Sequence, residues 1–316
     1  MRNEKLGIRK LFFVFYIFTG VAVFAQNTGV SYAIIHENPV PGEPVAVGIA
    51  ANNTSGIRQA VLYGSGGRRL AAAAFFSLGV QAENRPVVAA VLTVPSTAQP
   101  GFAVINIEGA LGLITEIPIV IREKQFRSDE IALNEALTGL RVEYDPQKTA
   151  EAELLWAIIN STGTEIYCDG NFIPPVSSTR RTGLFGDRRV YRYSNGKSDT
   201  SIHAGVDYGV PKGTPVLACA SGKVILARFR IVTGNSVIIE HLPGVYSLYY
   251  HLDSIEIGEN TMVEPGTQLG LSGATGLATG PHLHWEIRVS GENTDPDILI
   301  ERPLLDKDAI LAKMMN

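Results

Sequence analysis

The sequence predicts a mainly β protein with two β domains joined by a short helical connector. Apolar, β-branched runs of strand length recur along most of the chain, and Gly or Pro stands at nearly every junction between them. In the first part of the chain these runs are VSYAII, PVAVGIAA, QAVLYG, VVAAVLTV, FAVINI and ITEIPIVI, separated by PGEP, GSGG and PSTAQPG. Short strands at this spacing are typical of an immunoglobulin-like sandwich, to which we assign residues 27–122.

The connector is assigned to residues 123–178. Its segment EAELLWAIIN (151–160) places apolar residues on one side of a helix, and Asp145-Pro146 is a helix-start signal just upstream. Strand patterns then return as PVLACA, KVILARFR, SVIIEH, VYSLYYHL, TQLGLS and HLHWEIRV. They predict a compact antiparallel sheet domain over residues 179–300, followed by a C-terminal tail helix over residues 301–316.

The N-terminus has the composition of a secretory signal, which we assign to residues 1–25. Basic residues precede the apolar run LFFVFYIFTGVAVFA (11–25), and Val23 and Ala25 provide the small residues that signal peptidases require. An uncleaved membrane anchor is the alternative, but the run is shorter than the roughly 20 residues of a spanning helix. We therefore expect an exported protein of the periplasm or cell envelope, with no stable membrane insertion after cleavage.

Charge argues against a nucleic-acid partner. The sequence carries a net charge of −4, and residues 1–25 contribute +3, so the remainder carries −7. An acidic chain is a poor candidate for non-specific binding to nucleic acid. One basic cluster stands out, formed by Arg180, Arg181, Arg188, Arg189, Arg192 and Lys197. This cluster could form a basic face near an anionic substrate or could belong to a solvated loop, and the sequence favours neither interpretation.

The two cysteines, Cys168 and Cys219, are expected to be separate thiols. Export would permit a disulfide, but a domain of this size does not require one. Cys168 falls in the connector and Cys219 in an apolar strand, and neither has the spacing of a Cys-based zinc site.

Histidines concentrate in the second β domain in a pattern that suits zinc. The groups are His203-x-x-x-Asp207, Tyr-Tyr-His251-Leu and His282-Leu-His284. A hydrolytic zinc keeps three ligands from His and carboxylate side chains and one open position for water. Because His282 and His284 are two residues apart in a strand, their side chains leave the same face, so one can ligate while the other stands beside the metal. Each motif alone is weak, but together in one domain they predict a zinc site.

The segment 185–288 resembles the lysostaphin/LytM-type metallopeptidases, family M23. The matching stretches are FGDRR, HAGVDYGVPKGTPVLACASGKV, SLYYHLDS, VEPGTQLGLSGATG and TGPHLHWEI, in the family's order. The resemblance implies an M23-type peptidase domain, an antiparallel sheet whose groove binds extended peptide across one zinc ion.

The resemblance also implies a role for each site residue. His203, Asp207 and His284 match the family's zinc ligands. His251 and His282 match its non-ligand catalytic pair, which acts on the attacking water and the developing oxyanion, in an assignment that sequence leaves open. Two other histidines are left outside the site: His241 matches a position without a catalytic role, and His36 is expected at the surface or edge of the sandwich.

The function that follows from the resemblance is a zinc metalloendopeptidase that cuts peptide cross-links of bacterial peptidoglycan, with stem peptides as substrate. One alternative is a non-catalytic envelope regulator that binds and activates an amidase, but every ligand position is filled. Another is a D-Ala-D-Ala carboxypeptidase type of zinc hydrolase, which the order of the motifs disfavours. The N-terminal domain could also bind an envelope protein. Some family members are held latent by an upstream segment over the zinc, for which Asn171 and Asn195 are the candidates here.

Overall fold

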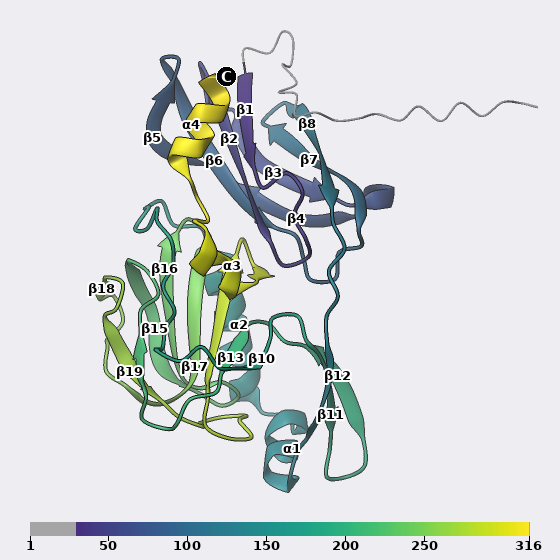
Figure 1. Ribbon diagram of the computed structural model, residues 1–316, viewed down its shortest axis with the longest axis vertical. Coiled ribbons are helices and arrows are strands. Elements are labelled where there is room, and N and C mark those ends of the chain that lie inside the picture. The colour runs from purple at the N-terminus through teal and green to yellow at the C-terminus, as the bar shows by residue number, and fades with distance from the viewer. Residues whose placement is uncertain (1–29, 316) are drawn as a thin grey trace, which may run out of the picture.

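The computed structural model describes residues 30–315, and the fold is mainly β, as predicted (Figure 1). The sandwich occupies the upper part of the view and the second β domain the lower left part, and the connector descends on the right from β8 to α1 at the bottom. The predicted signal sequence over residues 1–25 lies outside the described residues.

The N-terminal part is a sandwich of two four-stranded antiparallel sheets. Their orders are β1-β2-β6-β5 and β4-β3-β7-β8. When the eight strands are lettered A, B, C, C′, D, E, F and G along the chain, these orders become A-B-E-D and C′-C-F-G, which is the immunoglobulin arrangement. The strands are β1 (Val30–Ile35), β2 (Pro44–Ala51), β3 (Ile57–Tyr63), β4 (Arg69–Ala74), β5 (Phe76–Ala82), β6 (Arg85–Thr93), β7 (Gly101–Gly109) and β8 (Gly112–Ile121), with a short helix η1 (Ser65–Gly67) between β3 and β4.

Apolar side chains from both sheets fill the sandwich. Strand β2 is buried along its whole length, whereas β8 alternates buried and exposed residues over its second half. Ile49 of one sheet and Leu62 and Ile105 of the other belong to the same buried cluster. Alternation of this kind is expected for a sheet with one face on the core and one in water.

The connector contains one strand and two helices: β9 (Ser128–Ala132), α1 (Glu135–Val142) and α2 (Pro146–Ile159). Helix α2 begins where the sequence indicated, because the Asp145 carboxylate accepts a hydrogen bond from the Gln147 amide at 2.7 Å. Strand β9 and helix α1 were not predicted. Strand β9 pairs in parallel with β11 (Arg188–Arg192), and a partner that far along the chain leaves no mark on the local pattern.

The second β domain is built on one long sheet of order β10-β13-β20-β17-β16-β15-β18. Strands β14 and β19 pair with each other beside β17, β21 pairs with β20, and β9, β11 and β12 form a separate sheet of order β12-β11-β9. The remaining strands are β10 (Arg181–Gly183), β12 (Ser198–Ile202), β13 (Val206–Tyr208), β14 (Pro215–Leu217), β15 (Gly222–Arg230), β16 (Gly234–Leu242), β17 (Val245–Ile255), β18 (Met262–Val263), β19 (Gln268–Ser272), β20 (Leu283–Val289) and β21 (Glu292–Thr294).

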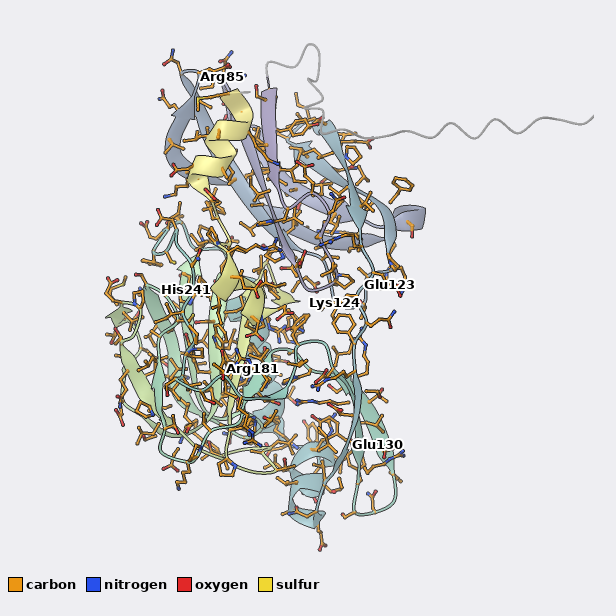
Figure 2. All side chains as sticks on the ribbon, in the orientation of Figure 1. Arg85, Glu123, Lys124, Glu130, Arg181 and His241 are labelled. Carbon is orange, nitrogen blue, oxygen red and sulfur yellow. The ribbon has the colours of Figure 1, made fainter. Side chains whose placement is uncertain are left out.

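The C-terminal end of the chain returns to the sandwich. After α3 (Pro296–Glu301), helix α4 (Lys307–Met315) lies against β1, β2 and β5 (Figure 1). Ile310 of α4 is fully buried, and a Cβ placed on Gly48 would lie 2.5 Å from its Cγ2, so the glycine allows the close approach. Lys124, between the two β domains, pairs with Asp295 at 2.8 Å (Figure 2). One hydrophobic cluster runs through both β domains, which therefore share a core.

Both cysteines are buried free thiols, as predicted. His36 follows the edge strand β1, where its Nδ1 accepts a hydrogen bond from Arg302 at 2.9 Å. Between residues 30 and 315, no helix is long and apolar enough to cross a membrane.

Candidate functional site

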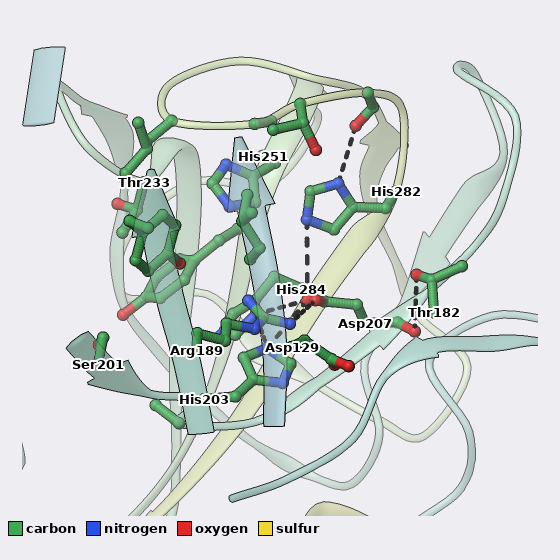
Figure 3. Close-up of a pocket in the computed structure, with 18 of the residues that line it drawn as sticks. Asp129, Thr182, Arg189, Ser201, His203, Asp207, Thr233, His251, His282 and His284 are labelled. Carbon is green, nitrogen blue, oxygen red and sulfur yellow. Dashed lines mark hydrogen bonds and ion pairs between the residues drawn. The ribbon is translucent and has the colours of Figure 1, made fainter. Parts of the chain in front are cut away.

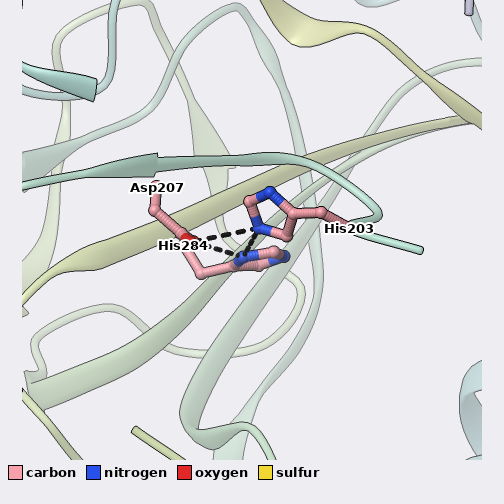
Figure 4. A group of neighbouring side chains, drawn as sticks. All are labelled: His203, Asp207 and His284. Atoms are coloured by element: carbon pink, nitrogen blue, oxygen red, sulfur yellow. Dashed lines mark hydrogen bonds and ion pairs between the residues drawn. The ribbon is translucent and has the colours of Figure 1, made fainter. Parts of the chain in front are cut away.

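His203, Asp207 and His284 come together as a buried group with the donor set of a zinc site (Figure 4). Asp207 on β13 lies directly opposite His284 on β20, and His203 follows the end of β12. Asp207 Oδ1 lies 2.7 Å from His284 Nδ1 and 3.1 Å from His203 Nε2, and the two nitrogens are 3.0 Å apart. All three potential ligand atoms lie within 4.8 Å of one another. Two imidazoles and one carboxylate are a ligand set that zinc accepts, so the residues fit this ion.

Hydrogen bonds fix which nitrogen of each ligand histidine is free when the ring is neutral, which is the form that binds a metal. His203 Nδ1 donates to the Leu184 carbonyl at 2.8 Å, which leaves Nε2 as the lone-pair nitrogen. His284 Nε2 donates to Glu286 Oε1 at 2.9 Å, which leaves Nδ1. The free nitrogens are the two that face Asp207. Such partners behind the ligands orient the rings and are typical of metal-binding histidines.

Electrostatics at the three ligands favour a cation. Burial raises the pKa of Asp207, but the imidazoles of His203 and His284 beside the carboxylate outweigh this effect and hold its pKa well below the usual range. Burial likewise lowers the pKa of His284, but bonds to Asp207 and Glu286 raise it to about 9 without a metal. A metal that binds here therefore displaces a proton from His284.

His251 and His282 stand beside this group, and their free nitrogens face the same pocket (Figure 3). His251 Nδ1 donates to the Thr275 carbonyl and His282 Nδ1 to the Gly280 carbonyl, each at 2.8 Å. Their ring centroids are 4.8 Å apart, and His282 Nε2 lies 3.7 Å from Asp207 Oδ1. Burial lowers the pKa of His282 and brings that of His251 to about 3. Both rings are therefore neutral at pH 7, and each presents an Nε2 lone pair.

A distortion of β17 turns His251 into the pocket. Adjacent strand residues normally point to opposite faces, yet Tyr250 and His251 both line the pocket. The register between β16 and β17 shifts at this point, and His251 has a φ of 62°, in the left-handed region that non-glycine residues rarely adopt. Its amide donates to the Thr233 carbonyl at 2.8 Å. Bulges of this kind re-aim side chains next to active sites.

The pocket around the five residues has a volume of about 780 Å³, and the connector supplies part of its wall. Asp129, Glu130 and Ile131 of β9 line it on one side, and the loop Leu277–Pro281 lines it on another. Among the described residues, neither Asn171 nor Asn195 lines this pocket. The connector therefore borders the groove through β9, a segment that sequence reasoning did not single out.

Two further residues of the site were missed from the sequence. Glu286 accepts from His284 and pairs with Arg288 Nη2 at 2.8 Å, and Arg189 Nη2 lies 2.5 Å from Asp207 Oδ2. The position of Glu286, two residues after His284 in a strand, was a usable signal, because it places both side chains on one face. Arg189 gave no such signal, since nothing in its spacing relates it to Asp207.

The basic cluster divides among separate partners. Arg181, Arg189 and Arg192 form ion pairs with Asp297, Asp207 and Glu130. His241 is fully buried, where its Nδ1 donates to the Ser221 carbonyl and its Nε2 accepts from Ser247 (Figure 2). It does not line the pocket among the described residues.

Known proteins resemble the C-terminal part of this chain most strongly. Residues 201–296 match peptidase family M23. The DD-carboxypeptidase/endopeptidase Mpg of Neisseria meningitidis is 37% identical over 145 residues, which cover 45% of this chain and 33% of that protein. The peptidoglycan DD-endopeptidase ShyB of Vibrio cholerae is 41% identical over 93 residues, which cover 29% of this chain and 22% of that protein. The chain thus spans a third or less of the length of these two curated relatives.

A solved structure extends the similarity beyond that segment. A crystal structure assigned to peptidase M23 from Pseudomonas aeruginosa superimposes with a TM-score of 0.57 at 25% identity. The match covers 83% of this chain and 94% of that one, so it includes the sandwich and connector as well as the second β domain. The family match coincides with the segment that carries His203, Asp207, His251, His282 and His284. Residues 201–296, which hold the whole candidate site, are therefore the part of the chain that is similar to peptidase family M23.

Proposed function

We propose that this chain is an exported zinc metalloendopeptidase that hydrolyses peptide cross-links of bacterial peptidoglycan. The observation that carries the proposal is the buried set of His203, Asp207 and His284, placed beside two neutral histidines at the wall of one pocket. The peptidoglycan substrate is inferred from the Vibrio cholerae relative, which is named a peptidoglycan DD-endopeptidase. The envelope location follows from that substrate and from the signal-like composition of residues 1–25.

The donor atoms that would hold zinc are His203 Nε2, Asp207 Oδ1 and His284 Nδ1. Zinc supplies a Lewis acid for the scissile carbonyl and lowers the pKa of water toward neutrality when it is bound. Two nitrogen and one oxygen ligand leave a position for a non-protein ligand, as catalytic zinc sites require. The site thus has the composition of a hydrolytic centre and not of a closed structural one.

The two neighbouring histidines are suited to moving a proton. His251 and His282 each have Nδ1 bonded to a backbone carbonyl, so Nε2 is free to accept a proton from water. The low pKa of His251 keeps the ring neutral at neutral pH. Once protonated, the same nitrogen can donate to the developing oxyanion or the leaving amine. His251 is buried and the His282 side chain is 17% exposed, so both rings have limited contact with bulk water.

A carboxypeptidase activity at the same site is the second candidate, because the Neisseria relative is named for both activities. The two differ in their products. An endopeptidase converts cross-linked muropeptide dimers to monomers, whereas a carboxypeptidase removes one C-terminal residue.

The decisive experiment incubates purified chain with defined muropeptides, with and without a chelator, and identifies products by mass. We expect about one zinc per chain, conversion of dimers to monomers, loss of cleavage with chelator and recovery on adding zinc. Metal-free protein that stimulates an amidase without cleaving would favour the regulator and refute the proposal.

A further inference from the structure

Strands β9, β11 and β12 turn one face toward the candidate metal site. Arg189 of β11, the central strand of this sheet, is in register with Asp129 of β9 and with Ser201 of β12. All three residues line the pocket that contains Asp207 and His284 (Figure 3). Because strand side chains alternate, residues in register share a face, so this small sheet forms one wall of the pocket.

Arg189 reaches from that wall to one of the candidate metal ligands. Its Nη2 lies 2.5 Å from Asp207 Oδ2, and the side chains are 14% and 9% exposed. The other carboxylate oxygen, Oδ1, is the one near His203 Nε2 and His284 Nδ1. The two oxygens of Asp207 therefore have separate partners: one faces the guanidinium and the other faces the two free histidine nitrogens.

The local fold leaves room for this contact. Gly183 of β10 lies opposite Asp207 of β13 in the antiparallel pair. A Cβ on Gly183 would lie 2.3 Å from Arg189 Nη2, 2.6 Å from Asp207 Oδ2 and 3.1 Å from His203 Cε1. Any side chain at position 183 would therefore displace the guanidinium or the carboxylate. The ion pair occupies a space that the backbone keeps open, unlike a pair formed by chance on an exposed surface.

We propose that Arg189 is a positioning residue for the metal site. By holding Oδ2, it fixes the rotation of the Asp207 carboxylate and presents Oδ1 to the ion between His203 and His284. An arginine is suited to this task because its planar guanidinium donates in fixed directions and stays charged at any working pH. The inference rests on the proposed zinc site. It means that β11, which carries none of the ligand motifs, helps to form that site.

A competing account predicts the opposite change in zinc affinity when Arg189 is removed. If Arg189 were a latch that occupies the metal's place, its removal would tighten zinc binding. If it positions Asp207, its removal weakens binding, since loss of a partner behind a metal ligand typically costs about 10- to 100-fold in metal affinity. Zinc affinity therefore separates the two accounts without reference to catalysis.

The test compares full-length Arg189→Met with the wild type and with Arg192→Met. Arg192 lies three residues along β11, pairs with the exposed Glu130 and, among the described residues, does not line the pocket, so the control removes the same charge from the same strand. Zinc affinity is measured by competition with a chromogenic chelator, and folding by melting of the metal-free proteins. We expect Arg189→Met to bind zinc about 10- to 100-fold more weakly, Arg192→Met to bind as the wild type does, and Arg189→Lys to recover part of the loss.

Arg189→Met that binds zinc as tightly as the wild type, or more tightly, overturns the inference, as does an equal loss in Arg192→Met. If Arg189→Met does not fold, Gly183→Ala is judged by the same criterion, because its methyl group displaces the guanidinium from Asp207. A wild-type chain that binds no zinc would overturn the proposed metal site together with this inference. Tight wild-type binding with an unaffected Arg189→Met overturns the inference alone.

Discussion

Glu286→Gln tests whether the partner behind His284 matters to the metal site. Glu286 is 6% exposed, accepts from His284 Nε2 at 2.9 Å and pairs with Arg288 at 2.8 Å. Burial raises the pKa of Glu286, but Arg288 and His284 outweigh it and bring the pKa to about 2. The residue is therefore a carboxylate at any working pH, and the substitution removes its charge while nearly keeping its shape.

The size of the effect follows from the lost charge. A hydrogen bond to a charged group contributes about 1.5 to 3 kcal/mol, against about 1 kcal/mol for a neutral one. Glutamine can still accept from His284 through its amide oxygen, so the loss is the difference, about 0.5 to 2 kcal/mol. At about 1.4 kcal/mol per factor of ten, this corresponds to zinc binding weakened roughly 2- to 30-fold.

The assay is chelator competition at pH 7.5, with Glu240→Gln as the matched control. Glu240 is also buried in the sheet, at 9% exposure, but it faces Tyr246 and the Gly163 amide, so its substitution is expected to leave zinc affinity unchanged. A Glu286→Gln protein that folds and binds zinc with unaltered affinity would refute the reasoning. Equal weakening in both variants would refute it as well, because the effect would then come from general loss of charge.

Three other outcomes are expected. His284→Ala should lose zinc and cleavage together, whereas His251→Ala should retain about one zinc per chain and lose most turnover; normal cleavage by His251→Ala in a muropeptide assay would show that it is not part of the machinery. Burial lowers the pKa of His241 to about 4 from 6.5, so the native state excludes a proton that the unfolded chain binds. The free energy of unfolding should therefore fall by about 3 kcal/mol as the pH is lowered from 6.5 toward 4, and it should not change from this cause above pH 6.5. Urea unfolding at pH 7 and pH 5 should show a smaller difference for His241→Gln than for the wild type. Ile310→Ala should cost about 2 to 5 kcal/mol in the free energy of unfolding, because this fully buried side chain joins α4 to the sandwich; a loss below about 1 kcal/mol would show that α4 is dispensable to the shared core.

The parts of the molecule that the sequence predicted are those that short-range pattern determines. Six strands in each β domain follow from apolar runs: β1–β3 and β6–β8 in the first, and β14–β17, β19 and β20 in the second. Helix α2 follows from its cap and its spacing of apolar residues. The three histidine motifs could be found because few residue types bind zinc, and within each motif these residues lie close together in the sequence. The structure then brings His203 and Asp207 together with His284, 77 residues beyond Asp207.

The parts that the sequence did not predict depend on contacts between distant segments. Strand β9 exists because it pairs with β11, and its own short sequence SDEIA gave no strand signal. Arg189 was grouped with other basic residues, although its partner is Asp207 and not solvent or a substrate. The inward turn of His251 depends on a positive φ at a bulge, which no sequence pattern of a non-glycine residue indicates.

The connector contacts the pocket wall on two sides, so it does more than cover the groove. On one side, β9 pairs with β11 and so holds the strand from which Arg189 reaches Asp207. On the other, Glu151 of α2 accepts from the Ile231 amide at 2.8 Å, directly before Val232 and Thr233 of the pocket wall. Removing residues before 179 would therefore leave β11 paired with β12 alone and would remove the contact of Glu151 with that wall. If the connector acted only as a cover, truncation would raise the rate of muropeptide cleavage; because it also builds the site, we expect truncation to lower both zinc affinity and cleavage.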